Sequence, residues 1–332
     1  MKIRLTLACA LLALVGCAAE KPSDGASANG AKTYRIAVIP KGTTHEFWKS
    51  VHAGAEQAAK EFGNVEVIWK GPLQESDREG QISLVQDFVT SRVDGICLAP
   101  LDSQGLIAPV RAAKAEGIPT VVFDSALAAD EDDIVSYVAT DNYHCGAMAA
   151  QAMAKMLDGK GRVILLRYSP GSESTEQREQ GFLDTLAKES PGIEILSSNQ
   201  HSGTSFENAF SVSQQLLLKF DKQVDGVFTV CEPNSTGMLR ALSEREELAG
   251  KVKFIAFDPN SRLIQAMSEG TVHGIVLQDP VKMGYLAVKA MVNHLTGQPT
   301  EKRVAIEEFI ATPANMSEPE MAKLLTPVQF ED

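Results

Sequence analysis

Short apolar runs alternate with longer amphipathic segments along most of the chain. Residues 34–39 (YRIAVI) are apolar without polar alternation, which predicts a strand buried on both faces. The apolar positions that follow recur at helical spacing: Phe47, Val51, Ala55, Ala58 and Phe62. Thr43 and Glu46 have the spacing of a capping box at the start of this helix. The same alternation predicts further strands near 65–69, 94–99 and 119–123 and further helices near 76–91 and 104–116. Strands that alternate with helices predict parallel sheets covered by helices on both faces.

The pattern occurs twice, with an offset of about 130 residues. Residues 93–96 (VDGI) open one predicted strand, and residues 224–227 (VDGV) open another. Residues 123–124 (FD) close an apolar strand, and residues 257–258 (FD) close its counterpart. This offset is far longer than the roughly 20 to 50 residues of solenoid repeats. The sequence therefore predicts two similar α/β lobes.

The N-terminal segment has a different character. Two basic residues precede the apolar run 5–15, which is too short to span a bilayer and predicts a secretory signal peptide over 1–16. Residues 14–17 (LVGC) match a bacterial lipobox, so we expect cleavage before Cys17 and a lipid on its sulfur. A plain signal peptide with an incidental cysteine is the alternative. Residues 17–32 contain no aromatic or β-branched residue, which predicts a flexible tether.

Composition and charge narrow the kind of partner. The 332 residues are 44% hydrophobic and 22% charged, which is typical of a water-soluble protein with room for two domains. The formal net charge is −12, and it becomes −14 when Lys2 and Arg4 leave with the signal. A chain this acidic repels polyanions, so we expect a small molecule or a protein as partner and no nucleic acid.

Three cysteines remain in the folded part: Cys97, Cys145 and Cys231. An odd number in an oxidising compartment does not make a disulfide framework. Cys97 lies in an apolar run and is expected in the core. Cys145 and Cys231 lie near predicted element ends, so a pair between them stays open, although we favour free thiols.

Polar side chains follow several predicted strands. Asp124 and Asp258 come directly after strands at equivalent places in the two lobes, Gln278 ends another strand, and Arg178 lies in the segment after a fourth. Three further candidates follow the first strand: His45, Phe47 and Trp48. Of the two aromatic residues, Trp48 is off the apolar stripe of its helix and is the stronger candidate. Ligands of open parallel sheets bind beyond the carboxyl ends of the strands, so we expect these groups to share one cleft. Paired hydrogen bonds from planar charged groups suit vicinal hydroxyls, and aromatic faces pack on the C–H face of a sugar ring.

Each candidate also has a purely structural interpretation. Asp124 and Asp258 have the position of helix N-caps. Arg178 has possible partners in Glu173 and Glu176 on a solvated helix face. The recurrence of the aspartates in both lobes favours the cleft.

Motifs for metal binding or catalysis are absent from the sequence. Residues 130–133 (DEDD) lack the glycine and oxygen spacing of a calcium loop, and the six histidines lack metal-ligand spacing. The sequence contains no G-x-S-x-G motif, no P-loop, and no G-x-G-x-x-G after the first strand. A glycosidase pair of Asp124 and Asp258 would need one raised pKa, whereas a nearby Arg178 would lower the pKa of both. We expect no metal, no cofactor and no enzymatic activity.

Motifs in a characteristic order carry a family resemblance. They are IAVI (36–39), HEFW (45–48), VDG (93–95), FD (123–124), ATDN (139–142), REQGF (178–182), GMLRAL (237–242), FD (257–258), QDP (278–280) and MG (283–284). From about residue 34 to about residue 310 the chain resembles the sugar-binding proteins of ABC importers, the type I periplasmic binding proteins that include ribose-binding protein. The resemblance implies two Rossmann-like lobes with parallel sheets flanked by helices, joined by a three-strand hinge.

The resemblance also implies borders and residue roles. The expected N-terminal lobe is 34–139 plus 279–308, and the expected C-terminal lobe is 140–278 plus 309–332, with Asp141 and Asn142 in the hinge. Phe47 and Trp48 match the aromatic residues that sandwich the sugar. The hydroxyl-binding positions are matched by four residues: Asp124, Arg178, Asp258 and Gln278.

Three neighbours of these positions depart from the ribose binders. His45 and Cys231 stand where the ribose binders have Asn, and Ser125 stands where they have Arg, so a ligand other than ribose is expected. Glu232, next to Cys231, completes the set of expected ligand-binding residues.

The implied function is transport. The chain would be a monomeric, lipid-anchored protein in the periplasm or on the outer face of the membrane. Its lobes would close on a sugar or polyol and deliver it to the permease subunits of an ABC importer with a cytoplasmic ATPase. A ligand-binding lipoprotein that serves a sensor kinase or chemoreceptor is the alternative. Sugar-responsive repressors share the fold, but they carry a helix-turn-helix where this chain has a signal and tether.

Overall fold

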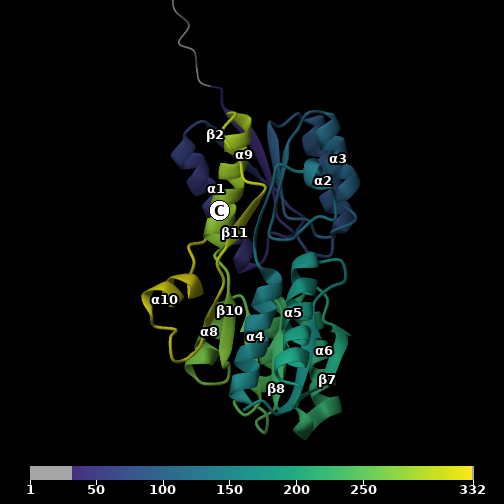
Figure 1. Ribbon diagram of the computed structural model, residues 1–332, viewed down its shortest axis with the longest axis vertical. Helices are drawn as coiled ribbons and strands as arrows, with labels where there is room; N and C mark the ends of the chain where they lie inside the picture. Colours follow the sequence, from purple (N-terminus) through teal and green to yellow (C-terminus); the bar gives the residue numbers. More distant parts are fainter. Residues whose placement is uncertain (1–31, 331–332) are drawn as a thin grey trace, which may run out of the picture. The chain divides into compact units, whose positions relative to one another are not determined.

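Two six-stranded sheets form the framework (Figure 1). The computed structural model describes residues 32–330. The first sheet contains, in spatial order, β11 (Arg303–Ile306), β5 (Ser136–Thr140), β4 (Thr120–Phe123), β3 (Gly95–Leu98), β1 (Tyr34–Ile39) and β2 (Val65–Trp69). The second contains β12 (Phe309–Ala311), β10 (Gly274–Leu277), β9 (Lys253–Phe257), β8 (Gly226–Thr229), β6 (Gly161–Arg167) and β7 (Ile193–His201). Neighbouring strands are parallel, except that β10 and β12 are antiparallel.

Helices cover both faces of each sheet. The first lobe has α1 (Glu46–Phe62), α2 (Arg78–Thr90), α3 (Ile107–Ala115) and α9 (Pro280–Leu295). The second has α4 (Asn142–Met156), α5 (Glu173–Glu189), α6 (Phe206–Phe220), α7 (Glu232–Ser243), α8 (Ser261–Ser268) and α10 (Pro319–Leu325). Short 3₁₀ turns occupy Glu131–Asp133 and Asp221–Gln223. Four apolar cores, one on each sheet face, hold the layers together, and the predicted two-lobed α/β fold is confirmed.

The chain passes between the sheets three times, from β5 to α4, from β10 to α9 and from β11 to β12. Its last described residues make a further contact between the lobes. Helix α10 packs in the core of the second lobe, whereas the Phe330 amide donates to the Lys49 carbonyl of α1 at 3.0 Å. The ring centroids of Phe330 and His52 lie 3.9 Å apart. The C-terminal tail therefore spans the two lobes.

The predicted elements agree closely with the observed ones where burial decides the pattern. Strand β1 occupies the predicted residues 34–39. The predicted capping box is wrong, because α1 begins at Glu46 with His45 as N-cap and without a side-chain cap. The Thr43 hydroxyl instead donates to the Pro72 carbonyl at 3.5 Å, so it is not available to the first turn of the helix. The predictions for residues 1–31, including the signal peptide and lipidated Cys17, lie outside the described residues.

The repeated Val-Asp-Gly motif has the same physical role in both lobes. The Asp94 carboxylate accepts the Arg35 amide at 2.8 Å, and the Asp225 carboxylate accepts the Arg162 amide at 2.8 Å. Each aspartate thus satisfies the backbone of the neighbouring strand at its start.

The glycine of the motif leaves space for a methionine. A Cβ added at Gly95 would lie 2.3 Å from the Met291 sulfur, and one added at Gly226 would lie 2.5 Å from the Met153 sulfur. These methionines come from α9 and α4, the helices that follow the connections between the lobes. The sequence repeat therefore marks equivalent contacts between helix and sheet.

A second pair of glycines sets the distance between α4 and α5. A Cβ on Gly146 would lie 2.0 Å from the Arg178 carbonyl oxygen, and a Cβ on Gly181 would lie 2.0 Å from the Tyr143 carbonyl oxygen. The two helix backbones touch where no side chain intervenes. This contact places Arg178 relative to the connection between the lobes.

Replacing Gly146 with alanine tests this close approach. In an open helix Gly→Ala stabilises by roughly 0.5–1 kcal/mol, whereas here we expect a loss of about 1–3 kcal/mol because the helices must separate. Urea unfolding of Gly146→Ala measures the sign. In the control Gly297→Ala the new carbon meets nothing within 4 Å, and only the left-handed backbone is penalised. A Gly146→Ala protein at least as stable as the parent would contradict the packing argument.

Candidate functional site

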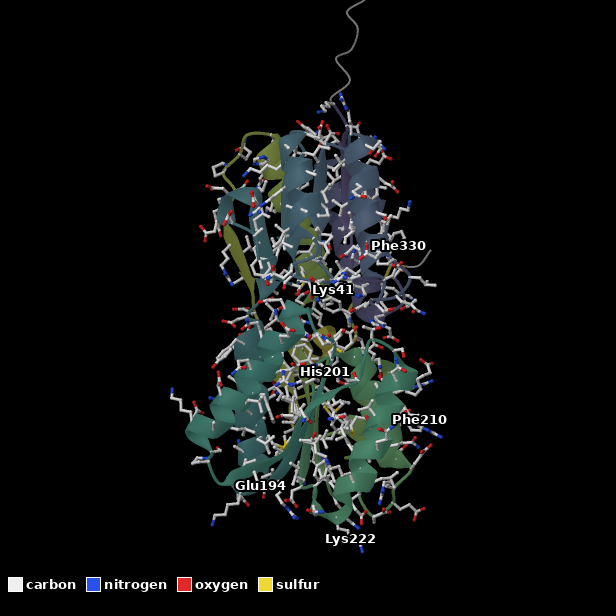
Figure 2. All side chains as sticks on the ribbon, turned by 90° about the vertical axis from the view of Figure 1, so that its right-hand side faces the viewer. Lys41, Glu194, His201, Phe210, Lys222 and Phe330 are labelled. Carbon is white, nitrogen blue, oxygen red and sulfur yellow. The ribbon has the colours of Figure 1, made fainter. Side chains whose placement is uncertain are left out.

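A hollow lies between the lobes, where the carboxyl ends of both sheets meet. Its cavity volume is about 40 Å³, so in this arrangement the lining side chains fill most of the space between the lobes. It is lined by Lys41, His45, Phe47, Trp48, Glu75, Asp124, Tyr168, Ser172, Ser174, Thr175, Arg178, Cys231, Glu232, Pro233, Asp258 and Gln278. Figure 2 shows Lys41 at the junction of the two lobes. The structure thus brings together nine of the ten residues expected to bind ligand.

The tenth residue, Ser125, is not among the lining residues. Its side chain is buried, and its hydroxyl accepts the Ser174 amide at 3.0 Å. The resemblance implies a cation at this position, and in this chain Lys41 supplies one from the loop after β1. The Lys41 ammonium lies 2.8 Å from the Asp124 carboxylate and donates to the Ser174 hydroxyl at 2.9 Å. Lys41 therefore connects the first lobe to the second as well as to Asp124.

The two aspartates have matching backbone geometry. Asp124 has φ 64° and Asp258 has φ 58°, both in the left-handed region that aspartate tolerates. Their amides donate to equivalent carbonyls of the next strand, Val138 and Val276, each at 3.0 Å. Neither aspartate is a helix N-cap, a role that Asn260 takes for α8. The tight turn directs one carboxylate from each lobe into the hollow.

Arg178 is held by neutral groups rather than by the glutamates of its own helix. Its Nε donates to Asn142 Oδ1 at 2.8 Å, and its Nη1 donates to the Val230 carbonyl at 2.8 Å. The guanidinium carbon lies 3.8 Å from the centroid of the Phe257 ring. These contacts fix the plane of the guanidinium and leave Nη2 for a ligand. Asn142, predicted in the hinge, thus also orients Arg178, while Asp141 caps α4 by accepting the His144 amide at 2.9 Å.

Glu75, which the sequence analysis missed, organises the first lobe's side of the hollow. Its buried carboxylate accepts the Trp48 indole at 2.6 Å and the Tyr168 hydroxyl at 2.8 Å, and lies 2.9 Å from His45 Nδ1. Trp48 is 3% exposed and packs edge-on against Phe47. The carboxylate therefore fixes Trp48 and His45 and also reaches Tyr168 in the other lobe.

The pKa values of Glu75 and His45 shift in opposite directions. Burial alone would raise the pKa of Glu75, but His45, Lys41 and Trp48 outweigh it and lower the pKa to about 2. Burial alone would lower the pKa of His45, but the Glu75 carboxylate outweighs it and raises the pKa to about 9. Glu75 and His45 are both charged around neutral pH.

The pKa values of the Asp258 and Glu232 carboxyls are raised, whereas that of Glu75 is lowered. Burial raises the pKa of Asp258 to about 6, against the opposing influence of Arg178 and of the Gln278 amide, which donates to it at 2.9 Å. Burial also raises the pKa of Glu232, although Asn260 donates to this carboxylate at 3.2 Å. These two carboxylates are therefore less well compensated than Glu75.

The three cysteines of the folded part are free and buried: Cys97, Cys145 and Cys231. The favoured prediction of free thiols is confirmed, and the alternative pair of Cys145 and Cys231 is not formed. The Cys231 thiol contacts Asn234 Oδ1 at 2.8 Å, and burial raises its pKa well above the ordinary value. Cys231 is consequently a neutral lining group of the hollow.

Most of the missed lining residues lie in loops. Lys41 directly follows Pro40 after β1, so the rule that ligands bind beyond strand ends could have identified it. Tyr168 directly follows β6, so the same rule could have identified it. Glu75 lies in the loop between β2 and α2 and lacks a comparable signal, because that loop carries no periodicity. Their contribution depends on how the lobes meet.

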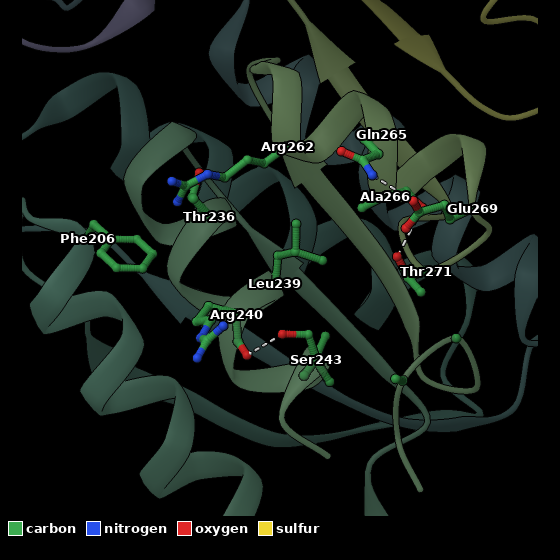
Figure 3. A pocket seen from close by; sticks show the side chains of 13 residues that line it. Phe206, Thr236, Leu239, Arg240, Ser243, Arg262, Gln265, Ala266, Glu269 and Thr271 are labelled. Carbon is green, nitrogen blue, oxygen red and sulfur yellow. Dashed lines mark hydrogen bonds between the residues drawn. The ribbon is translucent and has the colours of Figure 1, made fainter. Parts of the chain in front are cut away.

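A second and larger hollow lies on the second lobe, between α7 and α8 (Figure 3). Its cavity volume is about 600 Å³, and it shares no lining residue with the hollow between the lobes. Arg240 in its wall is already paired with Glu244 at 2.8 Å. None of the ten predicted ligand-binding residues lines it, so size alone does not identify the candidate site.

Within residues 32–330, no cluster of three or more metal-ligating side chains is present. The acidic segment 130–133 is engaged with basic residues, since Arg111 pairs with Asp130 at 3.0 Å and with Asp133 at 2.7 Å. No helix in this part of the chain is long and apolar enough to cross a membrane.

The fold and the hollow together define a two-lobed binding protein of the periplasmic type. Residues 36–299 match the family model described as a periplasmic binding protein domain, and the chain belongs to this family. This confirms the family and the two-lobed fold expected from the sequence, and it places the chain among binding proteins rather than enzymes.

Known relatives resemble the chain over most of its length. The ribose import binding protein of Bacillus subtilis is 26% identical over 91% of this chain and 96% of its own. The D-allose-binding periplasmic protein of Escherichia coli is 27% identical over 77% of this chain and 83% of its own. A solute binding protein from Agrobacterium vitis, solved with D-fucose, has a TM-score of 0.84 and 30% identity, covering 88% of this chain and 100% of its own.

The Glu75 and His45 pair makes stability depend on pH. The contribution of Glu75 is present above its unfolded pKa, near 4.5, and is lost as pH falls toward 2. The contribution of His45 is present below its unfolded pKa, near 6.5, and is lost as pH rises through 9. We therefore expect Glu75→Gln to destabilise the protein most between pH 4.5 and 6.5 and less at pH 9.5. Urea unfolding at pH 5.5 and 9.5 checks this, with the exposed Glu246→Gln as control. An equal loss at both pH values would contradict the pairing.

Proposed function

We propose that this protein captures a sugar or related polyol between its lobes and delivers it to an ABC importer. The observation that carries the proposal is the meeting of Asp124, Arg178, Asp258 and Gln278 in one hollow at the carboxyl ends of both sheets. Carboxylate, guanidinium and amide groups recognise hydroxyls through fixed, paired hydrogen bonds. Phe47 and Trp48 add aromatic surface for the C–H face of the ring.

The relatives support a sugar as the ligand class. Proteins named for ribose import, D-allose binding and fructose import resemble the chain over most of its length, as do solved structures with bound D-arabinose or D-fucose. Three to four charge-assisted hydrogen bonds of about 1.5–3 kcal/mol each, less the costs of ordering and desolvation, are compatible with micromolar affinity, about −8 kcal/mol.

Capture works through closure of the lobes. Lys41 donates across the cleft to Ser174 at 2.9 Å, and Tyr168 donates across it to Glu75 at 2.8 Å. A ligand that contacts Asp124 on one lobe and Asp258 on the other stabilises the closed arrangement by the contacts it gains there. The permease then recognises the closed, loaded protein, which acts as a monomer.

Export and anchoring follow from the N-terminal sequence. The family is extracytoplasmic, and the proposed lipid on Cys17 holds the folded part at the membrane by a tether that ends near residue 32. The formal net charge of −12 disfavours electrostatic attraction to anionic lipids, so in this proposal the lipid carries the attachment.

Arg178 is the most direct test of the site. We expect Arg178→Ala to weaken binding of the neutral sugars named above at least a hundredfold in calorimetry, because no other described guanidinium lines the hollow. Arg178→Lys keeps the charge but loses the planar donors, so a large loss is expected there too. The control is Arg240→Ala, in the larger hollow between α7 and α8, and it should bind the sugars with parental affinity. Parental affinity in both Arg178 variants would exclude this pocket.

The anchor is tested by cell fractionation. Cys17→Ser removes the acylated sulfur, so the exported protein should move from the membrane fraction to the soluble fraction. Cys97→Ser, which changes a buried thiol of the folded part, should stay with the membrane. A Cys17→Ser protein that remains membrane-bound would contradict the lipobox interpretation.

A further inference from the structure

In the hollow between the lobes, the ion pairs leave negative charge uncompensated. Three carboxylates in or beside it have a basic group close by: Asp124 lies 2.8 Å from Lys41, Glu75 2.9 Å from His45 and Glu179 2.8 Å from Arg167. In each of these three pairs the positive charge compensates the negative one.

The other two lining carboxylates have no such partner. Among the described residues, no basic side chain forms an ion pair within 4.0 Å of either Asp258 or Glu232. Their polar contacts are neutral amides: the Gln278 side chain for Asp258, and the Asn260 side chain and the Glu46 backbone for Glu232. Arg178 is the remaining cation among the described lining residues. Its contacts with Asn142, Val230 and Phe257 are all with neutral groups, so they hold it in place without an ion pair. One guanidinium therefore faces two carboxylates.

This surplus has an energetic consequence. A buried carboxylate without a cation costs several kcal/mol or takes up a proton. Burial is the largest cause that raises the pKa of both Asp258 and Glu232. The charges of Asp124 and Glu232 raise the pKa of Asp258 further, and the charge of Glu46 raises that of Glu232 further. The groups that face them are Arg178, His45, Asp124 and Glu46, and their charges do not cancel the surplus.

We propose that the ligand carries one positive charge, as an amino sugar or aminocyclitol does, and that its ammonium group lies against Asp258 and Glu232. This inference rests on the proposed function, since the rest of the ligand is a polyhydroxylated ring held by Asp124, Arg178 and Gln278. An ammonium offers three donors and a charge, which together satisfy two carboxylates better than a hydroxyl does.

Matched ligands test the charge directly. Calorimetry at pH 7.5 compares glucosamine, galactosamine and mannosamine with the parent hexose and the N-acetyl derivative of each, and an inosamine with its inositol. The amino compound should bind at least tenfold more tightly than its neutral counterparts in the set with the right stereochemistry. Neutral compounds that bind as tightly as the amino compound in every set would overturn the inference and leave sugar binding intact. The same measurement includes D-ribose, D-allose, D-arabinose and D-fucose. If none of these sugars and none of the matched compounds binds, the proposed function is contradicted as well.

A charge variant tests whether the ammonium group of the ligand lies against Glu232. Glu232→Gln keeps the shape of the side chain and removes one negative charge, so the affinity ratio of amino to neutral ligand should fall at least tenfold. The exposed Glu246→Gln changes the net charge by the same amount and should keep the parental ratio. Circular dichroism and thermal unfolding confirm that both variants are folded. An unchanged ratio in Glu232→Gln would overturn the assignment to this carboxylate pair.

Discussion

The carboxylate of Glu75 is the constraint on which the closed arrangement depends. It lies inside the protein, and a buried carboxylate is tolerated only when its oxygens are fully satisfied. Trp48 and His45 satisfy it from the same lobe, and Tyr168 satisfies it from the other. The orientation of an aromatic wall, the charge of a histidine and the approach of the second lobe are therefore coupled through one group.

The two lobes share one backbone plan and differ in their charges. Asp124 and Asp258 follow equivalent strands, adopt the same left-handed turn and make the same amide contact. The Asp124 carboxylate then lies 2.8 Å from the Lys41 ammonium, while the Asp258 carboxylate accepts from the Gln278 amide and has no ion pair among residues 32–330. The symmetric frame directs a carboxylate from each lobe to the cleft, and the loops around it decide how each carboxylate is compensated. The ligand completes the compensation on the side of the second lobe.

Periodicity and local pattern predicted much of the fold. Strand β1 was predictable residue for residue because a strand buried on both faces is continuously apolar. The Val-Asp-Gly repeat predicted two lobes because strand starts and helix contacts impose the same requirements twice. The rule that sites lie beyond strand ends identified Asp124, Asp258 and Gln278. The spacing pattern for a capping box failed at Thr43, whose hydroxyl donates to the Pro72 carbonyl in another loop.

By itself the sequence determined the two-lobed frame and most of the polar groups that face the cleft, because these follow from burial and from the direction of parallel strands. Only the tertiary structure decided which groups meet across the cleft. Lys41 meets Ser174 over 133 positions of sequence, and Glu75 meets Tyr168 over 93. Such partners share no period or spacing, since they are brought together when two separately built lobes close on each other. The displacement of Ser125 from the hollow and the surplus of negative charge at Asp258 and Glu232 have the same origin.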